Sequence, residues 1–443
     1  MRTNGFKIHS YTYLYVLVLF AVLSASLRLN DNGMTSFYRM LAPLGVAVCF
    51  FNRIRKYSKE IVFYIGMLAY STIVSLIFFH HIELNQVVFT TYVFFLYILI
   101  KELKIRDPNF ESSFWRFINA IVTITVVLAW IQHFVPYVMP YLEPPMNKGA
   151  MSVYFTNENE LGAALAAAFV IYLYILFFTK RKLTAGRLFN TISIPIILYL
   201  NDAKLSMMGI IVALFLYLLY YFRNIGVFKR LHDNAFVKIV ILIFVGLIIT
   251  LFIWNPKIRT RDYTMSIRDM FFNWIIAIFQ GQASGGLGTY QERSSAIVYG
   301  FREYFKTYGF GIGIGNSVYM LSWPQYILRY AKSMHNIILQ CLVELGYFAA
   351  VVYVIIIKKI RTLFVSVRAS EGNLLKAVFF ISLIFISSQS SVGFLSNYLE
   401  LAVIIFICLM DSDKFIAAQK GLKRHKEVVR EEMLASGLDQ PYA

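Results

Sequence analysis

The sequence has few charged residues for its length. Only 15% of its 443 residues are Asp, Glu, Lys or Arg, whereas 58% are hydrophobic. Together with a mean hydropathy of +0.62, this balance excludes an ordinary soluble multidomain protein. Among the charged residues, 24 are acidic and 42 are Lys or Arg, so the formal net charge is +18. The basic residues stand in short clusters between apolar runs, which indicates topology signals and not a nucleic-acid-binding surface.

Cysteine is also scarce, and it suggests no special chemistry. Cys49, Cys341 and Cys408 all fall in apolar stretches and lack the spacing of metal ligands. The histidines show no metal-site spacing either. We therefore expect the cysteines to be packing residues, and we expect no metal and no cofactor.

Long apolar runs fill most of the chain. A helix that crosses a bilayer needs about 20 mostly apolar residues, and the sequence offers twelve candidates. They lie at about 11–28, 35–52, 60–79, 84–101, 113–134, 160–179, 186–201, 203–222, 236–254, 335–357, 373–390 and 394–410. The run at 35–52 is weak because it contains Arg39 and Pro43, and the pair 186–201 and 203–222 is also compatible with a re-entrant hairpin. The first run lacks a cleavage site, so we expect it to be retained. The sequence thus predicts an all-α polytopic membrane protein.

The basic residues predict how these spans are oriented. Lys and Arg concentrate in alternate connections, at 53–59, 101–106, 180–187, 223–230 and 358–368. The tail after Asp411 is basic as well, whereas the other short connections hold little more than Arg28, Lys148 and Lys204. Since basic connections stay in the cytoplasm, both termini are predicted to be cytoplasmic and the long segment 255–334 to be outside.

Four regions follow from this topology. Residues 1–254 hold the first nine spans, 255–334 form an extracytoplasmic loop, 335–410 hold the last three spans, and 411–443 form a cytoplasmic tail. The loop is too long for a passive connector.

The long loop itself is predicted to be largely helical. Ser266 to Phe279 opens with a capping Ser and has an aromatic face, as expected of a helix that lies in the membrane interface. A second helix is predicted from about Gln291 to Thr307. A Gly-rich turn, Gly311 to Gly315, then leads the chain back into the membrane at His335.

Two features of this loop point to chemistry, and each has a plainer interpretation. The Gly311-x-Gly313-x-Gly315 turn follows no predicted strand and lacks a Gly-Lys-Ser/Thr ending, so it is not a nucleotide loop. It is either a flexible turn or a stretch of backbone held close to a lipid-linked phosphate or sugar. His335, at the start of an apolar helix, is either a structural residue or a general base.

Basic and amide side chains at the outer surface offer the other candidate contacts. Arg293 and its basic neighbours either contact solvent and headgroups or grip phosphate oxygens. Lys204 either extends its ammonium to the membrane surface or adds a cation to the site. Asn157 and Asn159 either cap the sixth span or hydrogen-bond sugar hydroxyls.

Taken together, these residues resemble the O-antigen polymerase and ligase superfamily of bacterial surface-polysaccharide enzymes. The resemblance covers roughly residues 150–350. It rests on Asn157-x-Asn159 at the entry to a span, on Arg293 followed eighteen residues later by Gly311-x-Gly313-x-Gly315-Asn316, and on His335-Asn336-x-x-Leu339 with Glu344 and Gly346. Ile297 and Tyr308 occupy places where the family usually has Trp and Pro, and Lys204 stands where it usually has Arg.

The resemblance implies a GT-C-like membrane fold and a metal-independent, inverting glycosyltransferase. Its donor would be a glycan on polyprenyl pyrophosphate, and its acceptor the hydroxyl of a lipid-linked repeat unit, outside the bacterial cytoplasmic membrane. His335 would be the general base, and Arg293 and Lys204 would bind the leaving pyrophosphate. The expected glycan contacts are Asn157, Asn159, Gly311, Gly313, Asn316, Asn336 and Glu344.

Membrane lipid and a chain-length regulator protein are the other partners that the resemblance implies. Three alternatives stay open. A ligase would transfer finished glycan to lipid A core or to protein by the same chemistry. A glycolipid flippase or transporter would show inverted repeats and charges near the bilayer midplane. A cell-wall polymerase would show an acidic loop pattern, which we do not find.

Overall fold

A computed structural model describes most of the helical part of the chain. It covers residues 11–24, 57–135, 151–155, 158–179, 184–201, 203–224, 257–259, 264–266, 289–326, 334, 336–366, 371–388 and 397–420. For 24, 222–224, 257–259, 264–266, 289–294, 371 and 420 the description is limited to the backbone.

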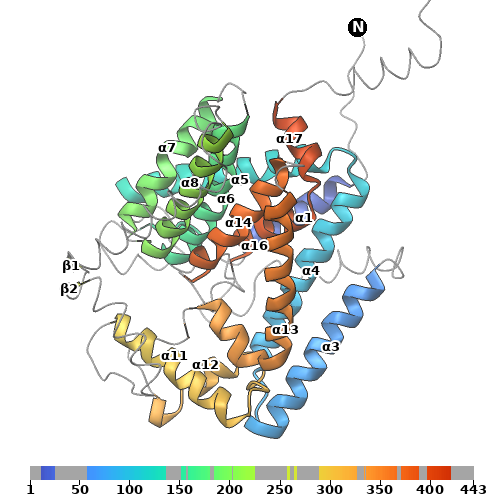
Figure 1. Cartoon of the computed structure of the whole chain (residues 1–443), viewed down its shortest axis with the longest axis vertical. Coiled ribbons are helices and arrows are strands. Elements are labelled where there is room, and N and C mark those ends of the chain that lie inside the picture. The colour runs from blue at the N-terminus through green and yellow to red at the C-terminus, as the bar shows by residue number, and fades with distance from the viewer. Residues whose placement is uncertain are drawn as a thin grey trace, which may run out of the picture.

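The described chain is helical apart from one short pair of strands (Figure 1). The first part of the bundle holds α1 (Thr12–Ser24), α3 (Ser58–Val74) with the π-helical turn η2 (Ser75–Phe79), α4 (Leu84–Arg106), α5 (Phe110–Phe134), α6 (Glu158–Phe178), α7 (Ala185–Leu200) and α8 (Lys204–Asn224). Strands β1 (Lys257–Arg259) and β2 (Thr264–Ser266) pair antiparallel. Then follow α11 (Thr289–Lys306), α12 (Asn316–Met320), the 3-10 turn η4 (Pro324–Tyr326), α13 (Ile337–Val365), α14 (Glu371–Ile386), α16 (Tyr398–Leu409) and α17 (Ser412–Lys420).

Ten of the twelve predicted spans correspond to these helices. The other two, 35–52 and 236–254, lie outside the described residues. Among the described helices, six are long and apolar enough to cross a membrane: α3 with η2, α4, α5, α6, α8 and α13. The apolar helices α1, α7, α14 and α16 are shorter. The chain is therefore a membrane-embedded helical protein, as predicted.

The predicted loop helices have different outcomes. The helix predicted from Gln291 to Thr307 is confirmed as α11, with its start two residues earlier. The interfacial helix was predicted to begin at Ser266. The structure has Ser266 as the last residue of β2, and residues 267–279 lie outside the described chain.

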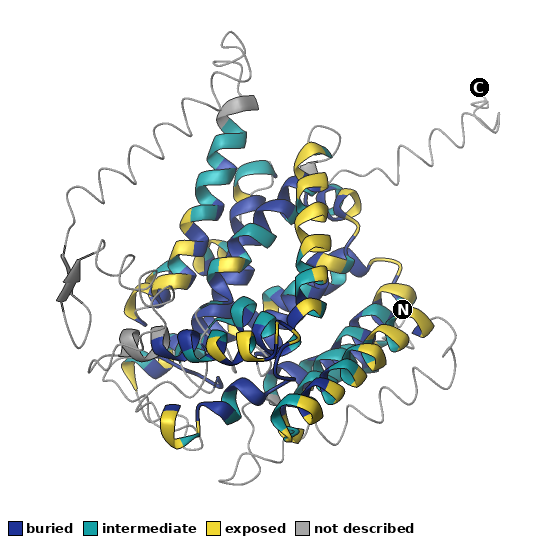
Figure 2. Ribbon diagram, turned by 60° about the horizontal axis from the view of Figure 1, so that its bottom comes forward, coloured by how far each residue is buried: buried dark blue, intermediate teal, exposed yellow. Residues whose placement is uncertain are grey.

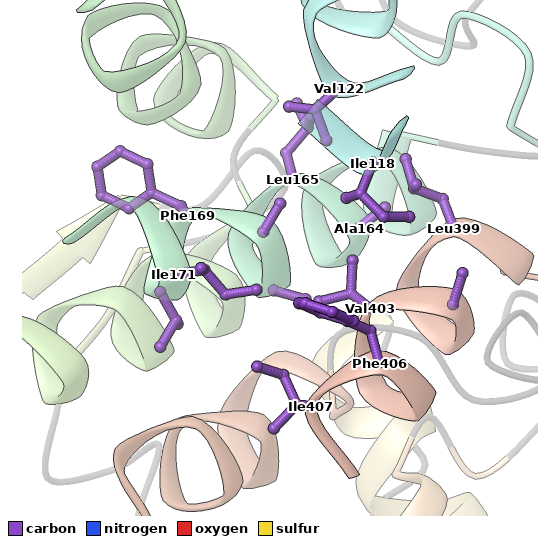
Figure 3. Packing of buried hydrophobic residues seen from close by; sticks show 14 of the residues in the cluster. Ile118, Val122, Ala164, Leu165, Phe169, Ile171, Leu399, Val403, Phe406 and Ile407 are labelled. Carbon is purple, nitrogen blue, oxygen red and sulfur yellow. The ribbon is translucent and has the colours of Figure 1, made fainter. Parts of the chain in front are cut away.

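Helix α6 forms the centre of the bundle. From Glu160 to Ile175 every residue of α6 is buried, because small side chains let neighbouring helices approach closely. A Cβ added to Gly162 would lie only 2.9 Å from the Cβ of Ala203, just before α8. Figure 3 shows Ala164 and Leu165 packed between side chains of α5 and α16, such as Ile118 and Val403.

The outer helices expose apolar side chains instead. Val62, Phe63 and Ile65 of α3 are more than half exposed, and so are Ile355 and Ile357 of α13. Figure 2 shows exposed residues along both helices. Large apolar surfaces of this kind fit contact with lipid acyl chains.

The two ends of the bundle differ in chemistry. Helices α11 and α12 lie at the end away from α17 (Figure 1). At the α17 end, basic side chains from two separate connections contact α16 and α17: Lys104 Nζ, from connection 101–106, donates to the carbonyl oxygen of Leu409, and Arg187 Nη2, from connection 180–187, donates to Gln419 Oε1 at 3.1 Å. Two of the basic connections found in the sequence thus meet at one end.

Candidate functional site at the end of the bundle with helices α11 and α12

The chain between α11 and α12 makes a tight turn built on alternate glycines, Gly309 to Gly315, which we call the glycine turn. Gly309, Gly311, Gly313 and Gly315 have φ angles of 81°, 93°, 89° and 81°. Positive φ values are strained for residues with a Cβ but open to glycine. The alternation therefore has a conformational cause.

One side of the glycine turn binds to a kink in α13. At Gly346, with φ 53° and ψ −129°, the backbone of α13 leaves the helical conformation. The amides of Ile312 and Gly313 donate to the carbonyls of Val343 (3.0 Å) and Glu344 (2.8 Å), and the Tyr347 amide donates to the carbonyl of Gly309 (3.1 Å). The turn thus satisfies backbone groups that the kink releases.

The glycines are required by how closely the two backbones approach. A Cβ on Gly311 would lie 2.6 Å from the Glu344 carbonyl oxygen, and one on Gly346 would lie 2.2 Å from the Phe310 carbonyl. Rigid backbone offers no room for either.

The other side of the turn packs on α3 and η2. The Ile314 amide donates to Ser71 Oγ at 2.8 Å, and Asn316 Nδ2 donates to Ser75 Oγ at 3.1 Å. A Cβ on Gly313 would lie 1.7 Å from Ser75 Oγ. The glycine turn therefore joins α3 to α13, and we call this contact the turn junction.

A buried carboxylate ties α12 to α13. Glu344 Oε1 accepts hydrogen bonds from Ser317 Oγ and, at 3.0 Å, from Gln340 Nε2. These donors offset the cost of burying the group.

Several residues that were predicted to contact the glycan therefore interact with other parts of the protein in the structure. Gly311, Gly313, Asn316 and Glu344 are buried in or beside the turn junction, and Asn336 caps α13 by accepting the Leu339 amide on its Oδ1 at 3.0 Å. Of the two interpretations of the glycine turn, the geometry favours a packed turn over an open phosphate loop. Contact of these five residues with a glycan stays a prediction.

The turn junction also fixes where α11 lies relative to the start of α13. Ile297, Ile312, Met334 and Val343 form one buried cluster. A Cβ on Gly300 of α11 would lie 2.8 Å from Met334 Sδ. Met334 directly precedes position 335, so α11 packs against the chain that carries the predicted base.

Arg293 belongs to the same face of α11. Ile297 and Gly300 stand four and seven residues after Arg293, and positions at this spacing share one face of a helix. The structure thus places position 293 on a helix that contacts Met334, the residue before position 335. The side chain of Arg293 and all of His335 lie outside the described residues.

A second group of predicted residues lies at the ends of α6 and α8. Lys204 is the first residue of α8 and is exposed, and the partly buried Asn159 stands in the first turn of α6. The contact of Gly162 with Ala203 brings these two helix ends together. Asn157 lies outside the described residues, directly before α6.

Buried amides fix the chain that leads into α6. Asn201 Oδ1 accepts the Met151 amide at 2.8 Å, and Gln132 Oε1 accepts the amides of Ser152 at 2.9 Å and Val153 at 2.7 Å. The structure brings together the helix ends that carry Lys204 and Asn159, and these helices, α8 and α6, are different elements from α11 and α13.

The sequence interpretation missed an aromatic cluster beside the turn junction. His81 stacks on Tyr319 with ring centroids 3.7 Å apart, Phe79 stacks on Trp323 at 5.1 Å, and Trp323 stacks on Tyr326 at 6.0 Å. Tyr319 and Trp323 are partly exposed. The signal was present as aromatic residues at positions 319, 323 and 326 of a polar loop.

One member of this cluster is held by a carboxylate. Tyr326 Oη donates to Glu303 Oε1 of α11 at 2.5 Å. Burial, and then the neighbouring Glu303 carboxylate, raise the pKa of Tyr326 to about 12. The phenol therefore stays protonated at neutral pH and holds η4 against α11.

Neither a protein-family model nor a curated protein matches this chain.

Proposed function

We propose that this chain is a membrane glycosyltransferase that polymerises lipid-linked oligosaccharide repeat units. The donor is a glycan on polyprenyl pyrophosphate, and the acceptor is a hydroxyl of a second lipid-linked unit. One observation carries the proposal: the face of α11 that includes position 293 packs on Met334, directly before His335. A cation and a base are thus expected on contacting elements.

The reaction requires both groups. The acceptor oxygen forms a bond to the anomeric carbon of the donor while the bond from that carbon to the pyrophosphate oxygen breaks. His335 takes the proton of the acceptor hydroxyl, and Arg293 stabilises the negative charge on the leaving pyrophosphate. Attack opposite the leaving group inverts the anomeric configuration.

Lys204 would add a second cation from the end of α8, with Asn159 beside it. A lipid pyrophosphate stays in the membrane and presents its charge at the surface, which is where a residue at a helix end can meet it. Partly exposed Tyr319 and Trp323 offer ring faces on which sugar rings can stack.

The distribution of basic residues supports an active site outside the cytoplasm. Lys104 of connection 101–106 and Arg187 of connection 180–187 meet at the α17 end, and the positive-inside rule assigns that end to the cytoplasm. Helices α11 and α12 lie at the opposite end (Figure 1), where the donor glycan would be presented.

Incubation of the purified chain with one defined lipid-linked repeat unit tests the proposal. A polymerase yields a ladder of products that differ by one repeat unit. Transfer that requires added lipid A core or protein would instead identify a ligase. Movement of the unit across proteoliposomes without any new glycosidic bond would identify a transporter and refute the proposal.

A further inference from the structure

Three lysines from three helices gather at the α17 end of the bundle. Lys104 lies in the last turn of α4, Lys376 in the second turn of α14, and Lys359 in the second half of α13. Lys104 Nζ donates to the Leu409 carbonyl, and Lys376 Nζ donates to the Met410 carbonyl at 2.8 Å. Two of the ammonium groups thus lie beside consecutive carbonyls at the end of α16, and Lys359 stands on α13, which packs against the helix α14 that carries Lys376. We call these residues the lysine triad.

The triad keeps much of its positive charge and hydrogen-bonding capacity. An ammonium group has three donors, and Lys104 and Lys376 each use one on a carbonyl. Within the described chain, none of the three lysines takes part in an ion pair, whereas Lys101 pairs with Glu60 on the same side of α4.

Two carboxylates of the described chain stand close to the triad. Asp411 directly follows Met410, and its Oδ1 accepts the backbone amides of Asp413 (3.1 Å) and Lys414 (3.2 Å) at the start of α17. Glu111 Oε1 accepts the Asp411 amide at 3.2 Å. Two carboxylates against three ammonium groups leave the triad with an excess of positive charge.

The neighbouring surface is apolar and ends at the triad. Val351, Val354, Ile355, Ile356 and Ile357 of α13 are all exposed. Lys358 and Lys359 follow directly and are exposed as well. Since an exposed apolar belt meets acyl chains, the lysines that end it lie at the level of lipid headgroups.

We propose that the lysine triad binds the phosphate headgroup of an anionic phospholipid whose acyl chains lie along the exposed face of α13. Ammonium donors from three helices surround a phosphate more fully than a single lysine does, and charge-assisted hydrogen bonds are the strong ones. This site requires only that the chain is membrane-embedded, and it is independent of the transfer reaction.

A plainer role would need no lipid. Lysines near a helix end can cap its last carbonyls and extend to water. Glutamine separates the two roles, because its side-chain amide can still donate to the Leu409 and Met410 carbonyls but carries no charge.

The test measures lipid retention by the full-length chain with native mass spectrometry, using phosphatidylglycerol and phosphatidylcholine in turn. The double variant Lys104→Gln/Lys376→Gln should bind phosphatidylglycerol more weakly, by about fivefold for each lost charge. Lys101→Gln is the matched control, since its ammonium is paired with Glu60, and it should bind as the wild type does.

Lys359→Gln decides the question if the double variant folds poorly. The Lys359 side chain is exposed and makes no hydrogen bond within the described residues, so its loss removes charge alone; about fivefold weaker binding is expected. Equal phosphatidylglycerol retention by wild type, Lys101→Gln and Lys359→Gln would overturn the proposal. So would displacement of the lipid by an equal concentration of inorganic phosphate, which would indicate a soluble ligand.

Discussion

The substitution Gly313→Ala tests whether the turn junction holds the site together. The new Cβ would lie 1.7 Å from Ser75 Oγ and 2.9 Å from Ser75 Cβ, on a residue whose φ is 89°. Left-handed backbone costs a residue with a Cβ roughly 1–2 kcal/mol, and overpacking costs about 1–3 kcal/mol more. We expect Gly313→Ala to lower the free energy of unfolding by about 2–5 kcal/mol.

The polymerisation rate of Gly313→Ala should fall by more than the loss of folded protein explains. The turn junction sets the position of α13 at its kink, and the cluster of Ile297, Ile312, Met334 and Val343 transmits that position to α11. A displacement of the order of 1 Å between reacting groups can cost about 100-fold in rate. The assay combines thermal unfolding in detergent with the polymerisation rate below the unfolding temperature.

Two further variants make this test specific. Gly66→Ala, in α3, is the matched control, because an added Cβ there meets nothing within 4 Å and alanine favours a helix by about 0.5–1 kcal/mol. Ser75→Gly removes the clashing side chain, so combined with Gly313→Ala it should restore part of the stability. If Gly313→Ala is as stable and active as Gly66→Ala, the turn junction does not position the site.

Three other predictions concern the proposed chemistry and the buried Glu344. Arg293→Ala should lower polymerisation about tenfold to a hundredfold, because one charge-assisted phosphate contact is worth roughly 1.5–3 kcal/mol; normal rates in a folded variant would remove Arg293 from the site. His335→Gln should lower turnover by roughly 10²–10⁴-fold while donor binding persists, and rapid chain growth by that variant would exclude the base. Glu344→Ala should destabilise the fold, since Ser317 and Gln340 lose their shared acceptor; an unchanged melting temperature would contradict this.

The long apolar runs of the sequence predicted the bundle helices well, because the length and composition of a segment decide whether it can cross a bilayer. Helix α11 was also predictable, from the apolar face that Ile297 and Gly300 share. The segment against which α11 packs was not predictable, because only the tertiary fold brings Met334 against Gly300.

The meaning of the glycine turn could not be read from its pattern. Alternate glycines indicate a close backbone approach, but they do not say whether the approaching group is a ligand or the protein itself. Here Ser75 and the backbone at Glu344 fill that space. Similarly, Glu344 looked like a polar residue available to a substrate, whereas the fold surrounds it with donors from α12 and α13.

The aromatic cluster shows the same limit in another form. His81 and Tyr319 are 238 residues apart in sequence, and the fold brings their rings together at a place where Asn316 Nδ2, at the start of α12, donates to the carbonyl of His81 at 3.2 Å. Pairings that depend on the tertiary fold leave little trace in a single sequence.

The anomeric configuration of the new linkage, measured by NMR together with the polyprenyl pyrophosphate released, tests the central claim most directly. The account predicts one pyrophosphate released for each glycosidic bond formed and a configuration opposite to that of the donor. Retained configuration, or consumption of the repeat unit without pyrophosphate release, would contradict it.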